Sequence, residues 1–224
     1  MVYSFVYEFC LIIVKILGRF VPKIKEFLNS RDRISKDIRH FNYSKNNFVI
    51  WVHCSSMGEF EQIKPLLKKI KKTKPITEFV ITFFSKSGFS SAKKFPDAKI
   101  ITYLPFDRKK DLNHFIIKIK PKALLLVKNE FWPNLINCVH NADIKIFSIS
   151  STFRKSQLFF NLYSFGMVSV LKKINCFFVV NENDKLLLES LNISNVQVTG
   201  DTRFDRVLEN YTNDSNDKKI KKFL

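Results

Sequence analysis

The sequence predicts an α/β fold with a parallel sheet covered by helices on both faces. Short apolar runs recur along the 224 residues, beginning at Phe48, Phe79, Lys99, Ala123, Lys145, Cys176 and Val196. Segments of helical period lie between them, for example residues 60–70 and 185–191. Short strands that alternate with helices are typical of β-α-β units, in which the strands are parallel. With 46% hydrophobic residues, the chain can bury the core of one large domain.

The amino-terminal segment, residues 2–21, is mostly apolar and long enough, at roughly twenty residues, to cross a bilayer as a helix. Glu8 and Lys15 interrupt it, and they share one helical face with Arg19. The large apolar side chains lie on the other sides: Phe5, Phe9, Ile12, Ile13 and Ile16. We therefore expect residues 1–22 to form an apolar helix that lies in a membrane interface. The alternative is an amphipathic helix packed on the domain itself.

Two further boundaries follow from composition. Residues 23–47 are expected to form a basic helical connector, and residues 48–211 the main domain. The last segment, residues 212–224, is rich in Asn, Asp, Ser and Lys, a composition that fits a solvated linker. No internal repeat is found in the sequence.

The first strand leads into a turn of small residues, His53-Cys54-Ser55-Ser56-Met57-Gly58-Glu59, which opens a helix expected over residues 59–72. Ligands of parallel sheets bind at the carboxyl ends of the strands, where Glu59 lies. Because a helix dipole favours a charged carboxylate in the first turn, we expect Glu59 to accept a proton at neutral pH. The alternative is a capping box between Ser56 and Glu59, which the pattern taken alone favours.

Two other strand ends also carry charge. Glu130 lies in Lys128-Asn129-Glu130-Phe131-Trp132-Pro133-Asn134, where proline suits the first turn of a helix. Arg203 lies among the charged residues 200–206, after the last apolar run. The residues alone favour a simpler interpretation, in which Glu130 is an exposed acid beside Trp132 and Arg203 forms an ion pair with Asp201 or Asp205.

These three pieces, together with residues 82–88, Tyr103-Leu104-Pro105 and residues 150–157, resemble in order and spacing the 3-deoxy-D-manno-octulosonic acid (Kdo) transferases. That family attaches Kdo to the lipid A precursor of Gram-negative bacteria. The resemblance covers nearly all of the chain and implies a Rossmann-like parallel sheet, the amino-terminal half of a GT-B glycosyltransferase. Residues 48–211 would then bind the acceptor, and residues 212–224 would link to a missing carboxyl-terminal donor domain.

The resemblance also implies roles for the residues that match. Glu59 would be the general base, and Glu130 and Arg203 would stabilise the transition state, whose charge suits a carboxylate and a guanidinium. Five other residues would bind the acceptor: Ser56, Gly58, Ser85, Ser87 and Lys128. Lys86 departs from the family pattern, in which proline commonly stands between the two serines.

The implied reaction transfers Kdo from CMP-Kdo to the lipid A precursor, lipid IVA, at the cytoplasmic face of the inner membrane. No metal and no cofactor is expected. Because most of the donor site would be missing, a separately encoded donor domain is a candidate partner. The alternative is a non-catalytic remnant of the fold that binds lipid or a protein partner.

A net charge of +18 also raises the possibility of a nucleic-acid-binding domain. The lysines are spread along the chain, however, and Lys, Asn, Ile and Phe are abundant while Ala and Gly are scarce, as in AT-rich genomes. We therefore expect no nucleic-acid partner, and a share of the charge suits an anionic membrane surface.

The cysteines and histidines predict no metal centre. Four widely separated cysteines, Cys10, Cys54, Cys138 and Cys176, give neither zinc-ligand spacing nor a disulfide framework. Among the histidines only His53 stands near a candidate site residue, and it is interpreted as a buried structural side chain.

Overall fold

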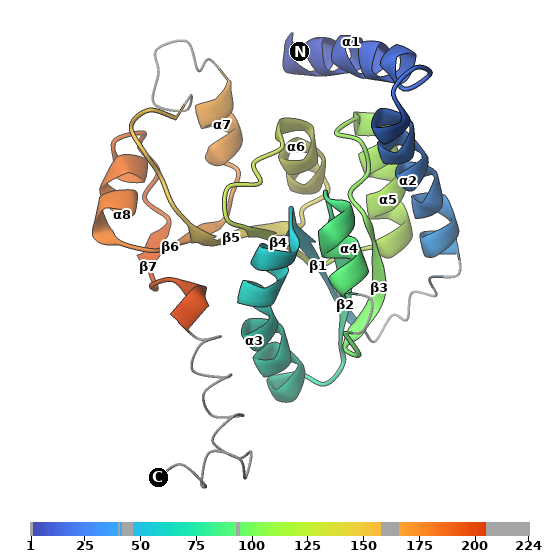
Figure 1. Cartoon of the computed structure of the whole chain (residues 1–224). Coiled ribbons are helices and arrows are strands. Elements are labelled where there is room, and N and C mark those ends of the chain that lie inside the picture. Colours follow the sequence, from blue (N-terminus) through green and yellow to red (C-terminus); the bar gives the residue numbers. More distant parts are fainter. Residues whose placement is uncertain (1, 40, 42–46, 93–94, 158–165, 205–224) are drawn as a thin grey trace, which may run out of the picture.

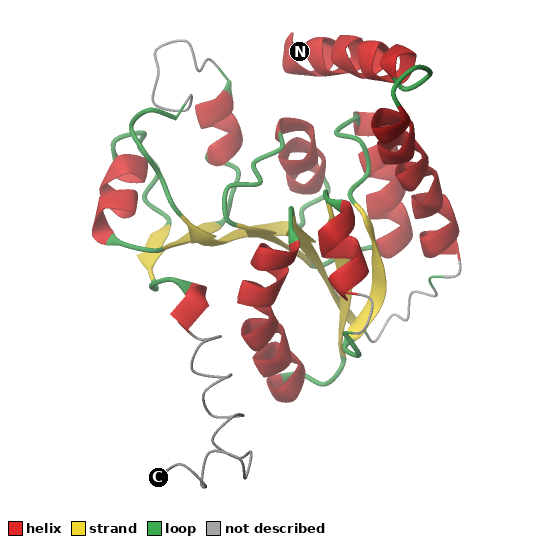
Figure 2. Ribbon diagram, in the orientation of Figure 1, coloured by secondary structure: helices red, strands yellow, loops and turns green. Residues whose placement is uncertain are grey.

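The computed structural model describes residues 2–39, 41, 47–92, 95–157 and 166–204. Its centre is a seven-stranded sheet in the order β3-β2-β1-β4-β5-β6-β7, with every neighbouring pair parallel. The strands are β1 Phe48–Cys54, β2 Thr77–Phe83, β3 Ala98–Tyr103, β4 Ala123–Val127, β5 Lys145–Ser151, β6 Cys176–Val179 and β7 Val196–Val198. The predicted α/β fold is thereby confirmed (Figures 1 and 2).

Helices join consecutive strands. They are α3 Met57–Thr73, α4 Lys86–Ala92, α5 Lys109–Ile119, α6 Pro133–Asn141, α7 Met167–Leu171 and α8 Glu182–Glu189. From β1 the chain builds outward to β2 and β3, and it then returns to place β4 on the other side of β1. Because parallel crossovers are right-handed, this reversal sends the later helices to the opposite face from α3 and α4. The reversal makes the carboxyl ends of β1 and β4 the expected ligand-binding crevice.

The strand positions predicted from the apolar runs are close to those observed. Five strands begin at the predicted residue, while β2 and β3 begin two residues and one residue earlier, at Thr77 and Ala98. Helix α8 begins before the predicted residue 185, because Asn181 and Asp184 form a capping box at its start. A polar first turn shows no helical spacing of apolar residues, so the sequence pattern predicts a later start for α8 than the one observed.

The core fills the space between the sheet and its helices. Its largest fully buried side chains include Trp51, Phe60, Phe83, Phe115 and Phe177. Helix α4 approaches the end of β2 so closely that a Cβ atom at Gly88 would lie 2.4 Å from the ring of Phe83. The close approach fixes Ser85 and the first turn of α4, which contains Ser87, against the end of the sheet.

Two helices precede the sheet, α1 Val2–Leu17 and α2 Pro22–Arg39. Helix α1 lies across the carboxyl end of the sheet, above α6 and beside α2 (Figure 1). Its polar side faces the domain: Tyr3 donates a 2.8 Å hydrogen bond to Asp107, Ser4 one of 2.7 Å to Asn134, and Glu8 pairs with Arg108 at 2.9 Å. The helix is therefore held by a specific polar contact.

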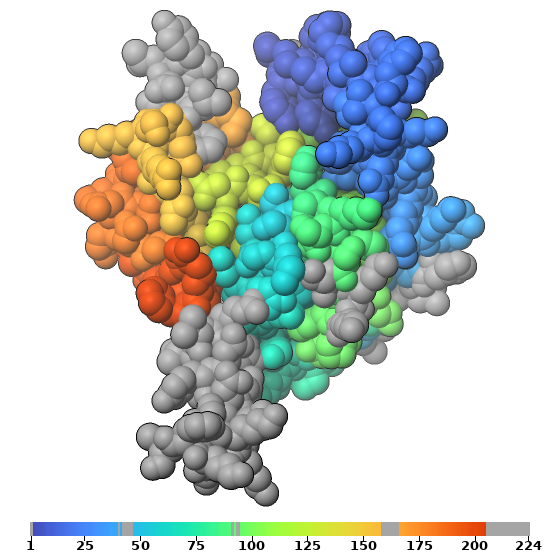
Figure 3. All heavy atoms as spheres, in the orientation of Figure 1, coloured from blue at the N-terminus to red at the C-terminus, as the bar shows by residue number. Residues whose placement is uncertain are grey.

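The opposite side of α1 is apolar and uncovered by described residues. Its exposed large side chains are Val2, Phe5, Val6, Phe9, Ile12, Ile13, Ile16 and Leu17, with Phe20 and Val21 following. Figure 3 shows this helix at the upper end of the molecule. None of the helices in the described part of the chain has the length and apolarity needed to cross a bilayer. The helix is packed on the domain through its polar side, while its apolar face points outward, and its place in a membrane interface stays a prediction.

Of the remaining predicted segments, one lies largely within the described residues and one lies outside them. The predicted connector, residues 23–47, contains most of α2. The predicted linker, residues 212–224, and the end of the predicted domain lie outside the described residues.

Candidate active site

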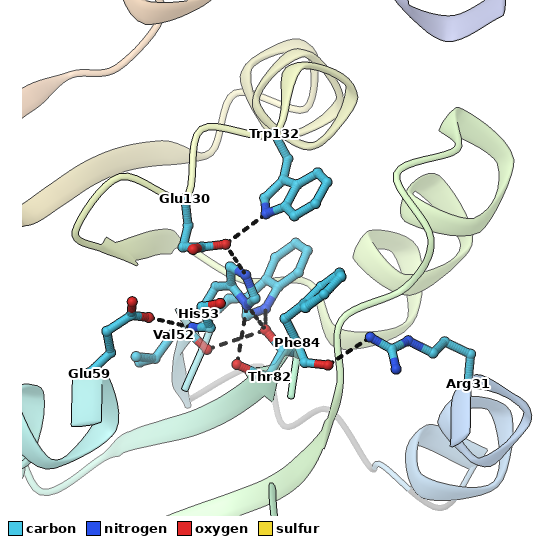
Figure 4. Close-up of polar contacts among 10 residues, drawn as sticks. Arg31, Val52, His53, Glu59, Thr82, Phe84, Glu130 and Trp132 are labelled. Carbon is cyan, nitrogen blue, oxygen red and sulfur yellow. Dashed lines mark hydrogen bonds and ion pairs between the residues drawn. The ribbon is translucent and has the colours of Figure 1, made fainter. Parts of the chain in front are cut away.

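The two strands at the reversal point each lead to one of the candidate glutamates. Glu59 lies in the first turn of α3, just after β1, and Glu130 lies in the loop after β4. The loops after β1 and β2 are joined by a 3.0 Å hydrogen bond from the Ser85 amide to the Ser55 carbonyl. Figure 4 shows both glutamates beside His53 at this end of the sheet. Parallel pairing has thus placed three loops, distant in sequence, around one crevice.

Glu59 does not form the capping box that its sequence pattern favours. Ser56 is the N-cap residue of α3, but its side chain makes no capping hydrogen bond. The Glu59 carboxylate instead accepts a 2.5 Å hydrogen bond from the amide of Ser55, one residue before the cap. The carboxylate is therefore fixed by the turn, with its side chain directed toward the crevice (Figure 4).

Burial raises the pKa of Glu59 above its ordinary value. The Ser55 amide opposes this rise, the charge of Glu130 adds to it, and His53 and Lys128 lower it again by smaller amounts. The helix dipole favours the charged form, as expected from the sequence, while desolvation is the larger effect and sets the direction of the pKa change. A carboxylate of raised pKa is a stronger base, so the raised pKa of Glu59 suits proton transfer.

Because burial disfavours the charged form, Glu59→Gln is expected to stabilise the protein near neutral pH. A group whose pKa is raised in the folded state stabilises that state when protonated, and the stability is lost as pH rises through the folded pKa. The neutral amide keeps an oxygen for the Ser55 amide and removes the charge penalty. Thermal unfolding should show a higher Tm than wild type near pH 7.5, with the gain shrinking near pH 4. A lower Tm at neutral pH would contradict the assignment.

Glu130 has the opposite electrostatic environment. The indole N–H of Trp132 donates a 2.9 Å hydrogen bond to its Oε2 atom, and His53 Nε2 lies 3.5 Å from the same oxygen. Burial alone would raise the pKa of Glu130, but interactions with His53, Trp132 and Ser55 outweigh burial and lower it. Two neighbouring carboxyl groups whose pKa values move apart are suited to different roles, one as a base and one as a permanent negative charge.

His53 connects Glu130 to the interior of the sheet. It is fully buried, and its Nδ1 atom lies 3.1 Å from the Thr82 hydroxyl, which accepts a 2.9 Å hydrogen bond from Trp51. The Nδ1 atom also lies 3.2 Å from the Thr82 carbonyl, and the Thr82 hydroxyl donates a 3.4 Å hydrogen bond to the Val52 carbonyl. The Nε2 atom faces Glu130 and makes no hydrogen bond within the described part of the chain. His53 is a buried histidine, as expected, but it also contacts a candidate site residue.

The basic residues of the site lie on the side of β5. Lys128 follows β4 in a left-handed conformation, φ 61°. Arg203 is 68% exposed and its guanidinium binds Asp201, at 2.5 Å and 2.7 Å from Oδ2. The pKa of Asp201 is lowered, since the hydrogen bonds from Arg203 and the charge of Lys128 outweigh burial. The ion pair is one of the two sequence alternatives for Arg203, and Asp205 lies outside the described residues.

The structure therefore brings together Glu59, Glu130 and Lys128. Among the described residues, the contacts of Arg203 reach neither glutamate.

The candidate acceptor-binding residues lie on the adjacent loops. Ser85 and Ser87 have hydroxyls 3.2 Å apart, and Ser85 also accepts a 3.3 Å hydrogen bond from the Gly88 amide. At Gly58 an added Cβ would meet only the Ser56 hydroxyl, at 3.9 Å, so protein packing does not require glycine there. The space beside Gly58 is open to a ligand. Ser56 and Gly58 thus lie at the turn that positions Glu59.

The described part of the chain offers no cluster of three or more His, Cys, Asp or Glu side chains arranged to hold a metal ion. Two interactions at this end of the sheet, one in the site and one beside it, are not predicted from the sequence. Trp132 was treated as a neighbour of Glu130 and not as its hydrogen-bond donor, although the two-residue spacing in a turn is a usable signal. Asp107, which anchors α1, has no such local signal because its partners are far away in sequence.

The fold is similar to that of several sugar-nucleotide enzymes of known structure. A UDP-GlcNAc 2-epimerase from Neisseria meningitidis aligns with a TM-score of 0.57 at 16% identity, covering 78% of this chain and 52% of that one. The UDP-GlcNAc 2-epimerase from Methanocaldococcus jannaschii aligns with a TM-score of 0.55 at 16% identity, covering 79% and 52%. At such low identity these similarities establish the Rossmann-like fold of the GT-B type alone.

Sequence relatives are more specific. A bifunctional glycosyltransferase/methyltransferase of Fusobacterium nucleatum is 36% identical over 208 residues, covering 90% of this chain and 31% of that protein. The 3-deoxy-D-manno-octulosonic acid transferase of Aquifex aeolicus is 38% identical over 89 residues, covering 39% and 24%, and that of Rickettsia bellii is 29% identical over 168 residues, covering 71% and 38%. The chain thus spans about a third of the length of these relatives.

A family profile gives the same result over most of the chain. Residues 30–206 match the profile described as 3-Deoxy-D-manno-octulosonic-acid transferase (kdotransferase). The matched range contains both glutamates, the serine loop and Arg203. The chain belongs to the 3-deoxy-D-manno-octulosonic-acid transferase family.

Proposed function

We propose that this chain is the acceptor-binding half of a glycosyltransferase that moves Kdo from CMP-Kdo to the lipid A precursor, lipid IVA. The observation that carries the proposal is the pair of carboxyl groups at the reversal point of the sheet, Glu59 with a raised pKa and Glu130 with a lowered one. Membership of the Kdo transferase family supplies the reaction class. The specific donor and acceptor are part of the proposal.

In the proposed reaction, Glu59 takes the proton from a hydroxyl of the acceptor sugar. The hydroxyl oxygen attacks the anomeric carbon of the donor, and the bond from that carbon to the CMP phosphate breaks, so the electron pair leaves with CMP. Glu130 keeps its negative charge and stabilises the positive charge that develops on the donor ring. Arg203 exchanges Asp201 for the departing phosphate or the donor carboxylate, which guanidinium binds well.

The donor is proposed to be held mainly by a domain outside residues 1–224, since the chain spans about a third of its relatives. The test is Kdo transfer from CMP-Kdo to lipid IVA, followed by mass spectrometry. It is made with the chain alone and with a donor domain taken from any adjacent coding sequence. We expect transfer only in the combination. Folded protein that binds lipid IVA but gives no transfer in either case would favour the alternative, a lipid-binding remnant of the fold.

We also propose that the chain lies on the cytoplasmic face of the inner membrane, held by the outer side of α1. Phe5, Phe9 and Ile12 are 76%, 59% and 56% exposed, while the polar side of the same helix is occupied by Asp107, Asn134 and Arg108. A helix whose apolar side faces outward is stabilised when that side enters a bilayer interface. Exposed apolar surface of this size is uncommon on a protein that remains in water.

Replacing Phe9, Ile12 and Ile16 together by serine is expected to weaken binding to anionic vesicles by more than about tenfold, because each side chain contributes roughly 1 kcal/mol or more when buried in lipid. Co-sedimentation with vesicles measures the effect. Ile117→Ser is the matched control, since Ile117 is 70% exposed but lies on α5. Equal losses in the triple variant and the control would contradict a role for α1.

A further inference from the structure

Arg31 of α2 is a buried cation that has no acidic partner among the described residues. The residue is only 7% exposed. Its guanidinium donates hydrogen bonds to neutral oxygens: the Ser30 hydroxyl at 2.8 Å, the Phe84 carbonyl at 2.8 Å and the Phe27 carbonyl at 3.4 Å. No carboxylate pairs with it in the described part of the chain. Burial lowers the pKa of Arg31 to about 10. Buried charges are normally compensated, so this one indicates a missing anion.

Aromatic rings hold the guanidinium in place without neutralising it. Its central carbon lies 3.8 Å from the centre of the Phe27 ring, 5.0 Å from that of Tyr103 and 5.1 Å from that of Phe84. A guanidinium carries five N–H groups. Three hydrogen bonds to neutral oxygens leave two of these groups for a ligand.

Arg31 lines a cavity of about 270 Å³ between the start of α2 and the loop after β2. Two lysines, Lys23 and Lys86, line the same cavity, and Glu26 is the one acid among its lining residues. Lys86 pairs with Glu26, yet their side chains are 72% and 60% exposed, so this ion pair is weak and easily exchanged. The cavity therefore has three cations and one displaceable acid.

We propose that this cavity binds a phosphate group, with Arg31 at its base and Lys23 and Lys86 at its mouth. Two N–H groups of a planar guanidinium match two oxygens of a phosphate, and the lysines neutralise its remaining charge. Lys86 exchanges Glu26 for the phosphate. This proposal extends the proposed function, because it assigns a ligand to residues outside the carboxylate pair.

The position of the cavity suggests two sources for the phosphate. The ring of Phe84 stacks on that of Trp132, with 5.5 Å between the ring centres, and Trp132 donates a hydrogen bond to Glu130. A pair of stacked rings therefore separates Arg31 from the candidate active site (Figure 4). A phosphate on an acceptor sugar bound in the active site is therefore one source that could reach the cavity. The exposed apolar residues Phe20 and Val21 directly precede α2, so the headgroup of a phospholipid bound at the outer side of α1 is the second source.

The test uses the full chain and direct binding. In one arm, calorimetry measures inorganic phosphate and glucosamine 1-phosphate, with unphosphorylated glucosamine as the blank. In the other arm, co-sedimentation compares vesicles of phosphatidylcholine with vesicles that also contain about one third phosphatidylglycerol. The variant Lys23→Ala/Lys86→Ala is compared with Lys25→Ala/Lys36→Ala, which removes the same charge from exposed positions of α2 outside the cavity.

We expect the cavity variant to bind phosphate about tenfold more weakly than the control variant, and Glu26→Gln to bind it more tightly because Lys86 is released. A loss confined to glucosamine 1-phosphate assigns the site to the sugar, and a loss confined to anionic vesicles assigns it to the headgroup. Equal binding by the two double variants in both arms would overturn the proposal. The test measures binding and not Kdo transfer, so it can be interpreted even if the chain is inactive. If the chain is active but the two double variants bind phosphate equally, only the phosphate site is refuted.

Discussion

Glu59→Ala is expected to lower the rate of Kdo transfer by about a hundredfold to ten-thousandfold, the usual contribution of a general base. The carboxylate is fixed by the Ser55 amide at the carboxyl end of β1, and its pKa is raised by burial, so it is both positioned and basic. No other carboxylate of the site has a raised pKa, since that of Glu130 is lowered. The initial rate of transfer, measured with the donor domain present, tests this.

Two further variants separate chemistry from structure. Glu59→Gln keeps the hydrogen bond from Ser55 but cannot take a proton, so we expect it to be as inactive as the alanine variant while its Tm rises. Glu61→Ala removes a carboxylate two residues away that pairs with Lys64, and we expect it to keep close to the wild-type rate. If Glu59→Gln kept more than about a tenth of the wild-type rate, Glu59 would be a positioning residue and another group would be the base.

Much of the fold was predictable because its signals are local. Each strand is a short apolar run, and the turn before Glu59 is built of small residues next to a helix start. Once the sheet is taken as parallel, the loops after all strands lie at one edge. The sequence therefore predicted that Glu59 and Glu130 lie at the same edge of the sheet, and the strand order then shows that β1 and β4 are neighbours there.

The electrostatics of the site could not be predicted in this way. The helix dipole at Glu59 is a local feature, but its burial depends on packing between elements far apart in sequence, and burial decides the direction of the pKa change. The same limit applies to Arg31. In the sequence it is one of many basic residues, and only the packing of α2 against the loop after β2 shows that it is buried without an acid.

The docking of α1 was also hidden from the sequence. Glu8 was recognised as a polar interruption in an apolar helix, but its partner Arg108 lies one hundred residues away. Tyr3 is 104 residues from Asp107, and Ser4 is 130 residues from Asn134. Hydrogen bonds across such distances in sequence leave no periodic pattern, so the sequence showed which side of the helix is polar and not what that side contacts.

Asp107→Ala is expected to destabilise the protein more than any other single change in the contact with α1. Asp107 is 1% exposed, and its carboxylate accepts hydrogen bonds from the Tyr3 hydroxyl at 2.8 Å, the Asn134 amide at 3.2 Å and the Leu135 amide at 2.8 Å. The two amides belong to the first turn of α6, whose N–H groups have no partner within the helix. Each donor left unsatisfied costs roughly 1–3 kcal/mol, so a total of about 3 kcal/mol or more is expected.

Urea unfolding and hydrogen exchange give independent measures of the change. Asp107→Asn should cost less than the alanine variant, because the amide oxygen still accepts from the backbone of α6 and the charge, whose burial raises the pKa of Asp107, is removed. Asp111→Ala is the control, since Asp111 makes only a 3.6 Å surface pair with Arg108 and should cost about 1 kcal/mol at most. In Asp107→Ala, amide exchange should be faster than in wild type in α1 and in the first turn of α6, and this increase should be larger than any increase in the sheet. Unchanged protection of α1 in this variant would show that other contacts, such as Glu8 with Arg108, suffice to hold the helix.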